Sequence, residues 1–280
     1  MRPVSEMSDV AATGVTCVLT DIDDTLTMNG RLGAAAYRAM EDLQAAGFAV
    51  VPVTGRPAGW CDLIARFWPV DGVIGENGAL YFRYDRAART MRSRFFTSAA
   101  ERTRNRTRLD TLANVILKAV PGTALASDQP YRVADLAIDF CEDVPPLGPE
   151  DVDEILKVFG EAGATAKASS IHVNGWFGDY DKLSMARAFL TGELGLAPSA
   201  IEQQVLFVGD SPNDEPLFAA FPLSVGVANV LRSAERIRHL PTYVASAEGG
   251  DGFVEIAERL IAARSKPSAH LGPMKIRASA

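Results

Sequence analysis

The 280-residue chain has few cysteines, and it lacks both long apolar runs and an apolar leader. Its three cysteines, Cys17, Cys61 and Cys141, are widely spaced and form no pair of the kind that binds a metal, so we expect reduced thiols. No apolar run reaches the roughly 18 residues that a membrane span needs, and the first residues contain no apolar core of signal-peptide length. These absences predict a cytoplasmic protein without a membrane partner.

The chain also has no excess of positive charge. Lysine and arginine total 28 against 35 aspartates and glutamates, which gives a formal net charge of −7 at pH 7. Surfaces that bind nucleic acid need clustered positive potential, so no nucleic-acid partner is expected. The hydrophobic content of 48% is that of a globular protein, and the length suffices for one large domain or two modest ones. The sequence leaves the oligomeric state open.

The order of apolar segments in the first part of the chain predicts an α/β fold. Buried strands alternate with helices there, with strands expected at 15–20, 48–53 and 72–74 and helices at 32–46 and 58–67. The turn Asn77-Gly78 predicts a hairpin with a return strand at 79–83, because Asn-Gly favours positive φ angles. Strands alternating with helices imply a parallel sheet with helices on both faces.

The alternation breaks and later resumes, which predicts an insertion. Between 86 and 178 the pattern mixes helices (109–120 and 151–162) with strands (133–140 and within 164–173). Afterwards the α/β order returns, with helices at 181–194, 215–220 and 252–264 and strands at 205–208 and 223–227. We therefore predict a Rossmann-like parallel-sheet core formed by 15–85 plus 179–262, with an inserted α+β cap at 86–178. Both ends of the chain, 1–14 and 265–280, are expected to be disordered.

Polar residues follow several of the predicted core strands directly. Asp21 and Asp23 come after the first strand, Thr54 after the second, and Asp210 and Asp214 after a later one. The carboxyl ends of the strands are where ligands bind in open α/β sheets. Four carboxylates in one crevice would repel one another unless a cation lay among them, and oxygen ligands without His or Cys suit Mg²⁺. A magnesium cofactor is therefore predicted.

The spacing of Asp21 and Asp23 allows two chemical tasks on one side of the chain. One carboxylate can attack phosphorus while the other moves protons. The plainer alternative is an acidic helix cap or a loop of solvated acids, and the later acids together with Lys182 argue against it.

Four segments together resemble the haloacid dehalogenase superfamily. VLTDIDDTLT (18–27) resembles its first motif, DxDxT after a hydrophobic strand, and VVPVTGR (50–56) its second. Lys182 in DYDKLSMA (179–186) is similar to its third motif, and VGDSPNDEPLF (208–218) to its fourth, GDxxND. The form TGRP, the turn ENGAL and the large insertion resemble the Cof-type branch (subclass IIB), which includes sucrose-phosphate phosphatases.

The resemblance implies a role for each matching residue. Asp21 would be the nucleophile that forms an aspartyl-phosphate, and Asp23 the acid and base. Phosphate would be bound by four further positions, Thr54, Gly55, Lys182 and Asn213. Magnesium would be held by Asp21, the backbone carbonyl of Asp23 and Asp210, with Asp214 acting through a water. The activity implied is a Mg²⁺-dependent phosphatase.

Other candidate residues keep two readings each. Arg56 could contact phosphate or the leaving group, or it could start a helix and face solvent. Asn77 could contact a ligand, although a turn-forming role is favoured. His172 and Asn174, with Trp176, could line a substrate pocket suited to a sugar or polyol, or form an ordinary strand and turn. The arginines between 83 and 108 could attract anions, but a solvated surface is favoured.

The substrate expected from a cap of this size is a small phosphorylated metabolite, with sugar phosphates leading. The nearest rival is a phosphomutase of the same superfamily. A receiver-like module phosphorylated on aspartate and a binder without catalysis are less favoured, because the chain is about twice the length of a receiver and every expected catalytic position is filled.

Overall fold

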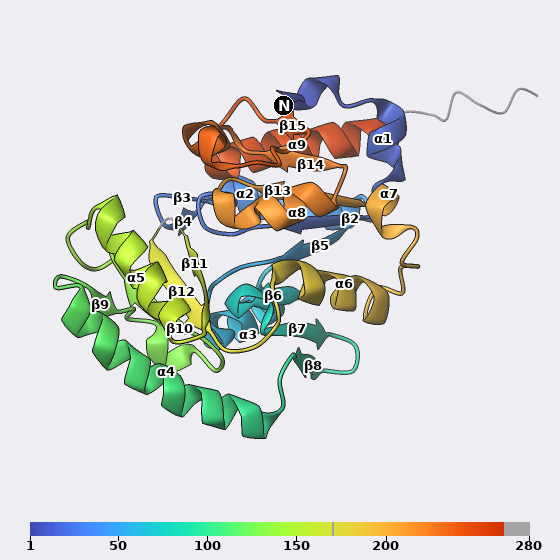
Figure 1. Ribbon diagram of the computed structural model, residues 1–280. Coiled ribbons are helices and arrows are strands. Elements are labelled where there is room, and N and C mark those ends of the chain that lie inside the picture. The colour runs from blue at the N-terminus through green and yellow to red at the C-terminus, as the bar shows by residue number, and fades with distance from the viewer. Residues whose placement is uncertain (170, 266–280) are drawn as a thin grey trace, which may run out of the picture.

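The computed structural model describes residues 1–169 and 171–265. Its centre is a parallel sheet whose strands lie in the order β1, β15, β14, β13, β2 and β5. These strands are Arg2–Pro3, Tyr243–Val244, Ser224–Gly226, Val205–Gly209, Cys17–Thr20 and Ala49–Pro52. The predicted Rossmann-like α/β core is confirmed (Figure 1).

Helices cover both faces of this sheet because its strands are apolar on both sides. In β2, Val18 packs on the face covered by α1 (Asp9–Gly14), α2 (Ala34–Ala45), α3 (Ala58–Phe67) and α9 (Gly249–Ser265). Leu19 points to the other face, which is covered by α6 (Lys182–Gly192), α7 (Ile201–Gln204) and α8 (Glu215–Ala220). Continuous apolar strands of this kind are what a sheet buried on both faces requires. No helix among residues 1–169 and 171–265 has the length and apolar character that crossing a bilayer requires.

An antiparallel sheet extends the core beyond β5. It contains β6 (Val73–Gly75), β7 (Leu80–Asp85) and β8 (Thr90–Phe95), and a bridge between Val53 and Ile74 joins it to the main sheet. The predicted hairpin lies between β6 and β7, where the short 3-10 helix η2 (Glu76–Gly78) forms the turn. The strand β8 was not predicted, and it pairs with β7 although the sequence analysis assigned its residues to the cap.

The inserted part of the chain forms a second layer of sheet and helices with its own apolar core. Its antiparallel sheet has the order β11, β12, β10 and β9, which are Thr165–Ala168, His172–Trp176, Leu136–Asp139 and Ala124–Leu125. The helices α4 (Ala99–Ala119) and α5 (Pro149–Glu161) contribute Leu109, Ile116 and Phe159 to that core. Figure 1 shows this α+β part beside the carboxyl edge of the main sheet.

Short elements complete the chain. A small hairpin of β3 (Thr27–Met28) and β4 (Arg31–Leu32) follows the first motif. The remaining 3-10 helices are η1 (Val4–Glu6), η3 (Gln129–Tyr131), η4 (Pro212–Asp214) and η5 (Ala228–Arg236).

The N-terminal segment differs from the prediction of disorder. β1 pairs with β15, and Val4 and Met7 are buried against the main core. Arg259 of α9 holds the segment through an ion pair of 2.8 Å with Asp9. The apolar residues of 1–14 are too sparse to show a period, so only their partners in α9 and β15 reveal that they are ordered. The predicted tail at 265–280 lies outside the described residues apart from Ser265, which ends α9.

The helix predicted at 109–120 begins ten residues earlier, at Ala99. Ser98 and Glu101 form a capping box there, with the Ser98 Oγ accepting from the Glu101 amide at 3.3 Å. The arginine-rich first turns concealed this start, because they lack the apolar spacing that marks a helix in sequence.

Candidate active site

Three of the predicted acids meet at the carboxyl edge of the main sheet. Asp21 directly follows β2, Asp210 follows β13, and Asp214 lies in η4. One carboxylate oxygen from each of them lies within 4.8 Å of the others, and all three residues are buried. Neighbouring parallel strands end at the same edge, which is why residues 189 positions apart can form one cluster.

Lys182 lies in the middle of this cluster. Its Nζ is 2.8 Å from Asp21 Oδ1 and 2.9 Å from Asp214 Oδ1, and the residue is 6% exposed. Asp181 positions it by capping α6, since the Asp181 carboxylate accepts from the Ser184 amide at 2.7 Å. One ammonium group therefore pairs with two of the three buried carboxylates.

The excess of negative charge shows in the pKa values. Burial first, together with the charges of Asp214 and Asp23, raises the pKa of Asp21 to about 8 against the opposing effect of Lys182. Burial and the neighbouring charges of Asp214 and Asp21 also raise the pKa of Asp210 well above its ordinary value. A divalent cation among these oxygens would reverse both shifts.

The donor set fits such a cation. It contains carboxylate oxygens only, which suits Mg²⁺ better than softer metals. Asp210 is oriented from both sides, because its Oδ1 accepts from Thr25 at 3.1 Å and its Oδ2 from Asn229 at 3.0 Å. Asp214 uses one oxygen for Lys182 and the other for the Asp210 amide at 3.1 Å. Sequence reasoning did not single out Asn229, for which no pattern exists.

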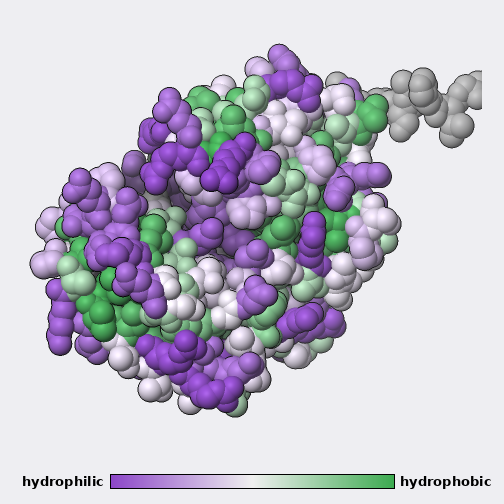
Figure 2. All heavy atoms as spheres, viewed as in Figure 1, coloured by the Kyte–Doolittle hydropathy of each residue, from purple (hydrophilic) through white to green (hydrophobic). Residues whose placement is uncertain are grey.

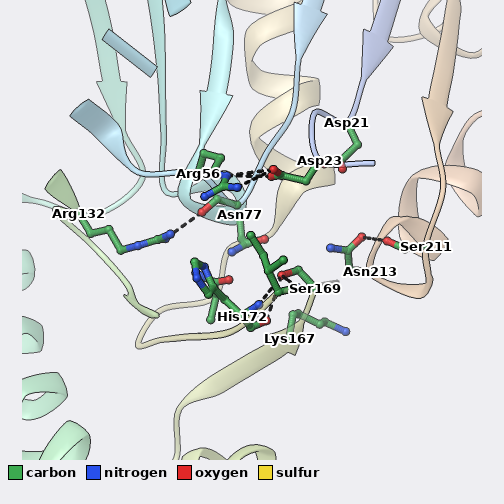
Figure 3. Close-up of a pocket in the computed structure, with 13 residues that line it drawn as sticks. Asp21, Asp23, Arg56, Asn77, Arg132, Lys167, Ser169, His172, Ser211 and Asn213 are labelled. Carbon is green, nitrogen blue, oxygen red and sulfur yellow. Dashed lines mark hydrogen bonds and ion pairs between the residues drawn. The ribbon is translucent and has the colours of Figure 1, made fainter. Parts of the chain in front are cut away.

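Asp23 points away from this cluster and pairs with Arg56. The guanidinium group donates to both Asp23 oxygens, at 2.8 Å from Nη2 to Oδ1 and 3.1 Å from Nε to Oδ2. Arg56 is 5% exposed and lies against the Trp60 ring at 4.6 Å. The solvated-arginine reading is therefore wrong, and Arg56 instead orients the predicted proton-transfer residue (Figure 3).

A carboxylate from the inserted part reaches the same arginine. Glu142 Oε1 lies 2.9 Å from Arg56 Nη2, and its Oε2 lies 2.9 Å from His172 Nε2. Contacts with His172 first, and with Arg56, lower the pKa of Glu142 to about 2. The Asp139 carboxylate positions Glu142. It accepts a hydrogen bond from the Glu142 backbone amide at 2.8 Å and from the backbone amides of the residues on either side. Sequence reasoning missed Glu142, because nothing local distinguishes it from other surface acids.

A second arginine joins the inserted part to the phosphate-binding turn predicted at Thr54-Gly55. Arg132 Nη1 donates to the Gly55 carbonyl oxygen at 2.8 Å. Its charge is balanced by Asp128 at 2.9 Å and Asp135 at 3.0 Å, and Asn174 Nδ2 donates to Asp135 at 3.1 Å. This buried network fixes Asn174 relative to Gly55.

Glu76 forms a further buried contact between the segment 133–135 and the start of α3. Its carboxylate accepts from the amides of Val133, Ala134 and Asp135 at 2.9, 2.6 and 3.1 Å, and from the Ala58 amide at the start of α3 at 2.9 Å. Neither Glu76 nor Arg132 could be recognised from sequence, since their partners lie far away along the chain.

A pocket opens between the core and the inserted part. Several predicted site residues line it together with Arg132, Lys167 and Ser211; they are Asp21, Asp23, Gly55, Arg56, His172, Asn174 and Asn213. Figure 3 shows the labelled residues of this lining around the pocket, and Figure 2 shows hydrophilic residues gathered in a recess between the two parts. Thr54 lies beneath the pocket, fully buried, where its Oγ1 accepts from the Arg56 amide at 3.0 Å.

Two predicted contributors do not line this pocket. Trp176 is 1% exposed and stacks on Tyr180, with ring centroids 5.6 Å apart, and it lines a neighbouring pocket together with Lys182. The arginines at 83–108 lie on β7, β8 and α4, and none of them is among the residues that line this pocket.

Comparison with known proteins agrees with the site. Residues 18–103 match the family of haloacid dehalogenase-like hydrolases. A phosphoglycolate phosphatase from Methanospirillum hungatei is 31% identical over 85% of this chain and 94% of its own length. The chain therefore belongs to the haloacid dehalogenase-like hydrolases. The predicted class of enzyme, a phosphoric monoester hydrolase, is confirmed at this level.

Solved structures share the fold. A Thermoplasma acidophilum protein superposes with a TM-score of 0.67 at 19% identity, covering 88% of this chain and 98% of that one. The sucrose-phosphatase of a Synechocystis species, solved with sucrose and phosphate, gives a TM-score of 0.60 at 18% identity over 87% of this chain and 97% of that one. The predicted Cof-type, subclass IIB architecture is thereby confirmed.

Proposed function

We propose that this phosphatase hydrolyses a small phosphomonoester through an aspartyl-phosphate on Asp21. The observation that carries the proposal is the cluster of Asp21, Lys182, Asp210 and Asp214 at the carboxyl edge of the sheet. In the first step an Asp21 oxygen bonds to phosphorus, the bond to the leaving oxygen breaks, and Asp23 gives that oxygen a proton. In the second step Asp23 takes a proton from water, which attacks phosphorus and releases phosphate and free Asp21.

The chain's own groups bind the phosphoryl oxygens during both steps. Lys182, the Gly55 amide, Thr54 and Asn213 supply positive charge or hydrogen-bond donors for oxygens that carry negative charge in transfer. Asp21, the Asp23 carbonyl and Asp210 would hold Mg²⁺, with Asp214 acting through a water. When bound, the cation offsets the charge of the carboxylates and of the phosphate.

The leaving group that fits the pocket best is neutral and rich in hydroxyl groups, such as a sugar or polyol. Arg56 is paired with Asp23 and Glu142, and Arg132 with Asp128 and Asp135, so both guanidinium groups of the lining are already neutralised. His172 and Asn174 add groups that can bond to hydroxyls. A second anion on the substrate would therefore gain little attraction here.

Phosphoglycolate is the second candidate, because the Methanospirillum hungatei relative is a phosphoglycolate phosphatase. Its carboxylate would have to replace Glu142 beside Arg56 and His172. The exposed fraction of the Glu142 side chain, 28%, leaves room for such an exchange.

A screen of purified protein against sugar, polyol and carboxylate phosphomonoesters tests both candidates. Free phosphate is measured with and without Mg²⁺ and with bisphosphate activators. Mg²⁺-dependent release from polyol or sugar phosphates supports the proposal, and release from phosphoglycolate alone supports the second candidate. A product that keeps its phosphoryl group at a new position would show a mutase. Stable phosphorylation without turnover would show a receiver-like module, and phosphate binding without either would show a binder.

A further inference from the structure

The turn that joins β6 to β7 holds a buried amide without a partner. Asn77 is 5% exposed, and within the described part of the chain its Nδ2 has no hydrogen-bond partner. Leaving such a donor unbonded in the interior costs about 1–3 kcal/mol, and buried polar groups are nearly always bonded. The position therefore calls for an acceptor that residues 1–169 and 171–265 do not supply.

The backbone of this turn is strained in a way that fixes the amide. Glu76 has a φ of +44° and Asn77 a φ of +54°, which are two successive non-glycine residues in the left-handed region. The Asn77 amide nitrogen of the backbone donates to the Thr54 carbonyl at 3.1 Å. The turn is thus bonded to the strand that ends at the predicted phosphate-binding residues.

The Asn77 side chain lies against a residue that is assigned to phosphate binding. A Cβ on Gly55 would lie 3.2 Å from Asn77 Nδ2, so the side chain packs directly against the Gly55 backbone. The next residue of the turn packs on the start of α6, because a Cβ on Gly78 would collide with the Asp181 carbonyl and lie 2.9 Å from the backbone nitrogen of Lys182. Asn77 lines the pocket that contains Asp21 and Asn213, and also a neighbouring pocket that contains Lys182.

We propose that the Asn77 side chain is a further phosphate ligand, donating an Nδ2–H bond to a phosphoryl oxygen between the Gly55 amide and Lys182. The inference rests on the proposed function, because it takes the same pocket as the phosphate site. The phosphoryl group supplies the acceptor that the buried amide lacks. The strained turn is then the means by which the chain brings this donor to the ligand.

The rival explanation is that Asn77 serves only to form the turn. A glycine at this position distinguishes the two explanations. Asn77→Gly keeps the left-handed backbone, which glycine adopts without strain, and removes the amide. Asn77→Asp keeps the size and the turn preference but replaces the donor by a carboxylate. Asn29→Gly is the matched control, since Asn29 also has a positive φ of +50° but is exposed in the turn between β3 and β4.

The experiment measures the Kd of inorganic phosphate by titration calorimetry in Mg²⁺, with thermal unfolding as the check on folding. We expect Asn77→Gly to fold and to raise Kd about tenfold or more, as the loss of a bond to a charged group does. Asn77→Asp should raise it further, and Asn29→Gly should leave it unchanged. A Kd within twofold of wild type in Asn77→Gly would show a turn former only.

The Kd of phosphate also tests the Asn77 assignment independently of the hydrolytic activity. Wild-type protein that binds phosphate but hydrolyses no phosphomonoester would contradict the proposed function and leave the Asn77 assignment standing. Wild-type protein that binds no phosphate would overturn the assignment of Asn77. If Asn77→Gly does not fold, a Kd of Asn77→Asp within twofold of wild type still overturns the assignment, because a carboxylate in place of a phosphate donor must weaken binding.

Discussion

Asp21 and Asp23 lie two residues apart yet have different surroundings. Asp21 faces Lys182 inside the acid cluster, whereas Asp23 turns to Arg56 beside the inserted part. This separation is consistent with the proposed roles, attack on phosphorus by the first and proton transfer by the second. Each assignment can be tested by one substitution.

Asp21→Asn should lower phosphate release by about four orders of magnitude or more, because an amide oxygen is a poor nucleophile at phosphorus. The fold should remain, since asparagine fills the same volume and removes one negative charge from a site where buried carboxylates repel one another. Single-turnover phosphate release and thermal unfolding measure the two effects. Substantial residual turnover would rule out Asp21 as the nucleophile.

Asp23→Asn should slow hydrolysis of alkyl phosphates by about 10²–10⁴-fold, the range for loss of general acid–base catalysis. Substrates with good leaving groups, such as nitrophenyl phosphate, need little protonation and should be affected less in the step that forms the intermediate. The kcat/KM ratio of the variant to wild type for both substrate types is the measurement. An equal loss for both would contradict the proton-donor role.

Residues that follow a strand could be predicted from sequence, and residues that act across the molecule could not. Asp21, Thr54 and Asp210 follow apolar strands, which places them at one edge of the sheet. Glu142 and Arg132 act through partners more than 70 positions away, at Arg56 and Gly55. Only the folded chain brings those groups together.

At the scale of elements, the turn Glu76–Gly78 joins four parts of the molecule. It closes the hairpin of β6 and β7, packs on α6, and binds the start of α3 and the segment 133–135 through Glu76. The sequence predicted the hairpin from Asn77-Gly78, whose turn preference is local. It could not predict the other three contacts, which depend on where the inserted part returns to the core.

Glu76 also predicts a pH dependence of stability. Burial first, and the charge of Asp135 next, raise the pKa of Glu76 from 4.5 to about 7. A carboxyl group with a raised pKa in the folded state contributes its stabilisation below pH 4.5 and loses it as pH rises through about 7. The free energy of unfolding of wild type, relative to Glu76→Gln, should therefore fall by about 3 kcal/mol across this window.

Denaturant unfolding of both proteins at several pH values, in constant Mg²⁺, measures that difference. Taking the difference removes the titration of groups that both proteins share. Glu154→Gln is the control, because Glu154 is an exposed partner of Lys157 and exposed ion pairs contribute little. A flat difference between pH 4.5 and 7 would contradict the raised pKa of Glu76.

At the scale of the whole molecule, the inserted part is joined to the core by buried charges. Arg132 contacts Gly55, Glu76 accepts three amides of the segment 133–135, and Glu142 reaches Arg56. Breaking such pairs one side at a time leaves an uncompensated buried charge, which is costly. The position of the inserted part is therefore coupled to the residues proposed to bind phosphate and transfer protons.

From this coupling we predict that Glu142 helps to determine which leaving group is accepted. Glu142→Gln removes one of the three carboxylates that pair with Arg56 and leaves Asp23 and Asp128, so the lining beside His172 becomes less negative. We expect the ratio of kcat/KM for phosphoglycolate to that for glycerol phosphate to rise about tenfold, the effect of roughly 1.4 kcal/mol of added attraction for the second anion.

Asp143→Asn is the control, because it neutralises an exposed acid in the same turn, directly after Glu142. An unchanged ratio in Glu142→Gln, or an equal rise in Asp143→Asn, would mean that general electrostatics rather than the Arg56 contact sets the preference. A fall in the ratio would instead show that Glu142 helps to bind the carboxylate substrate, and the neutral leaving group would then lose its main support.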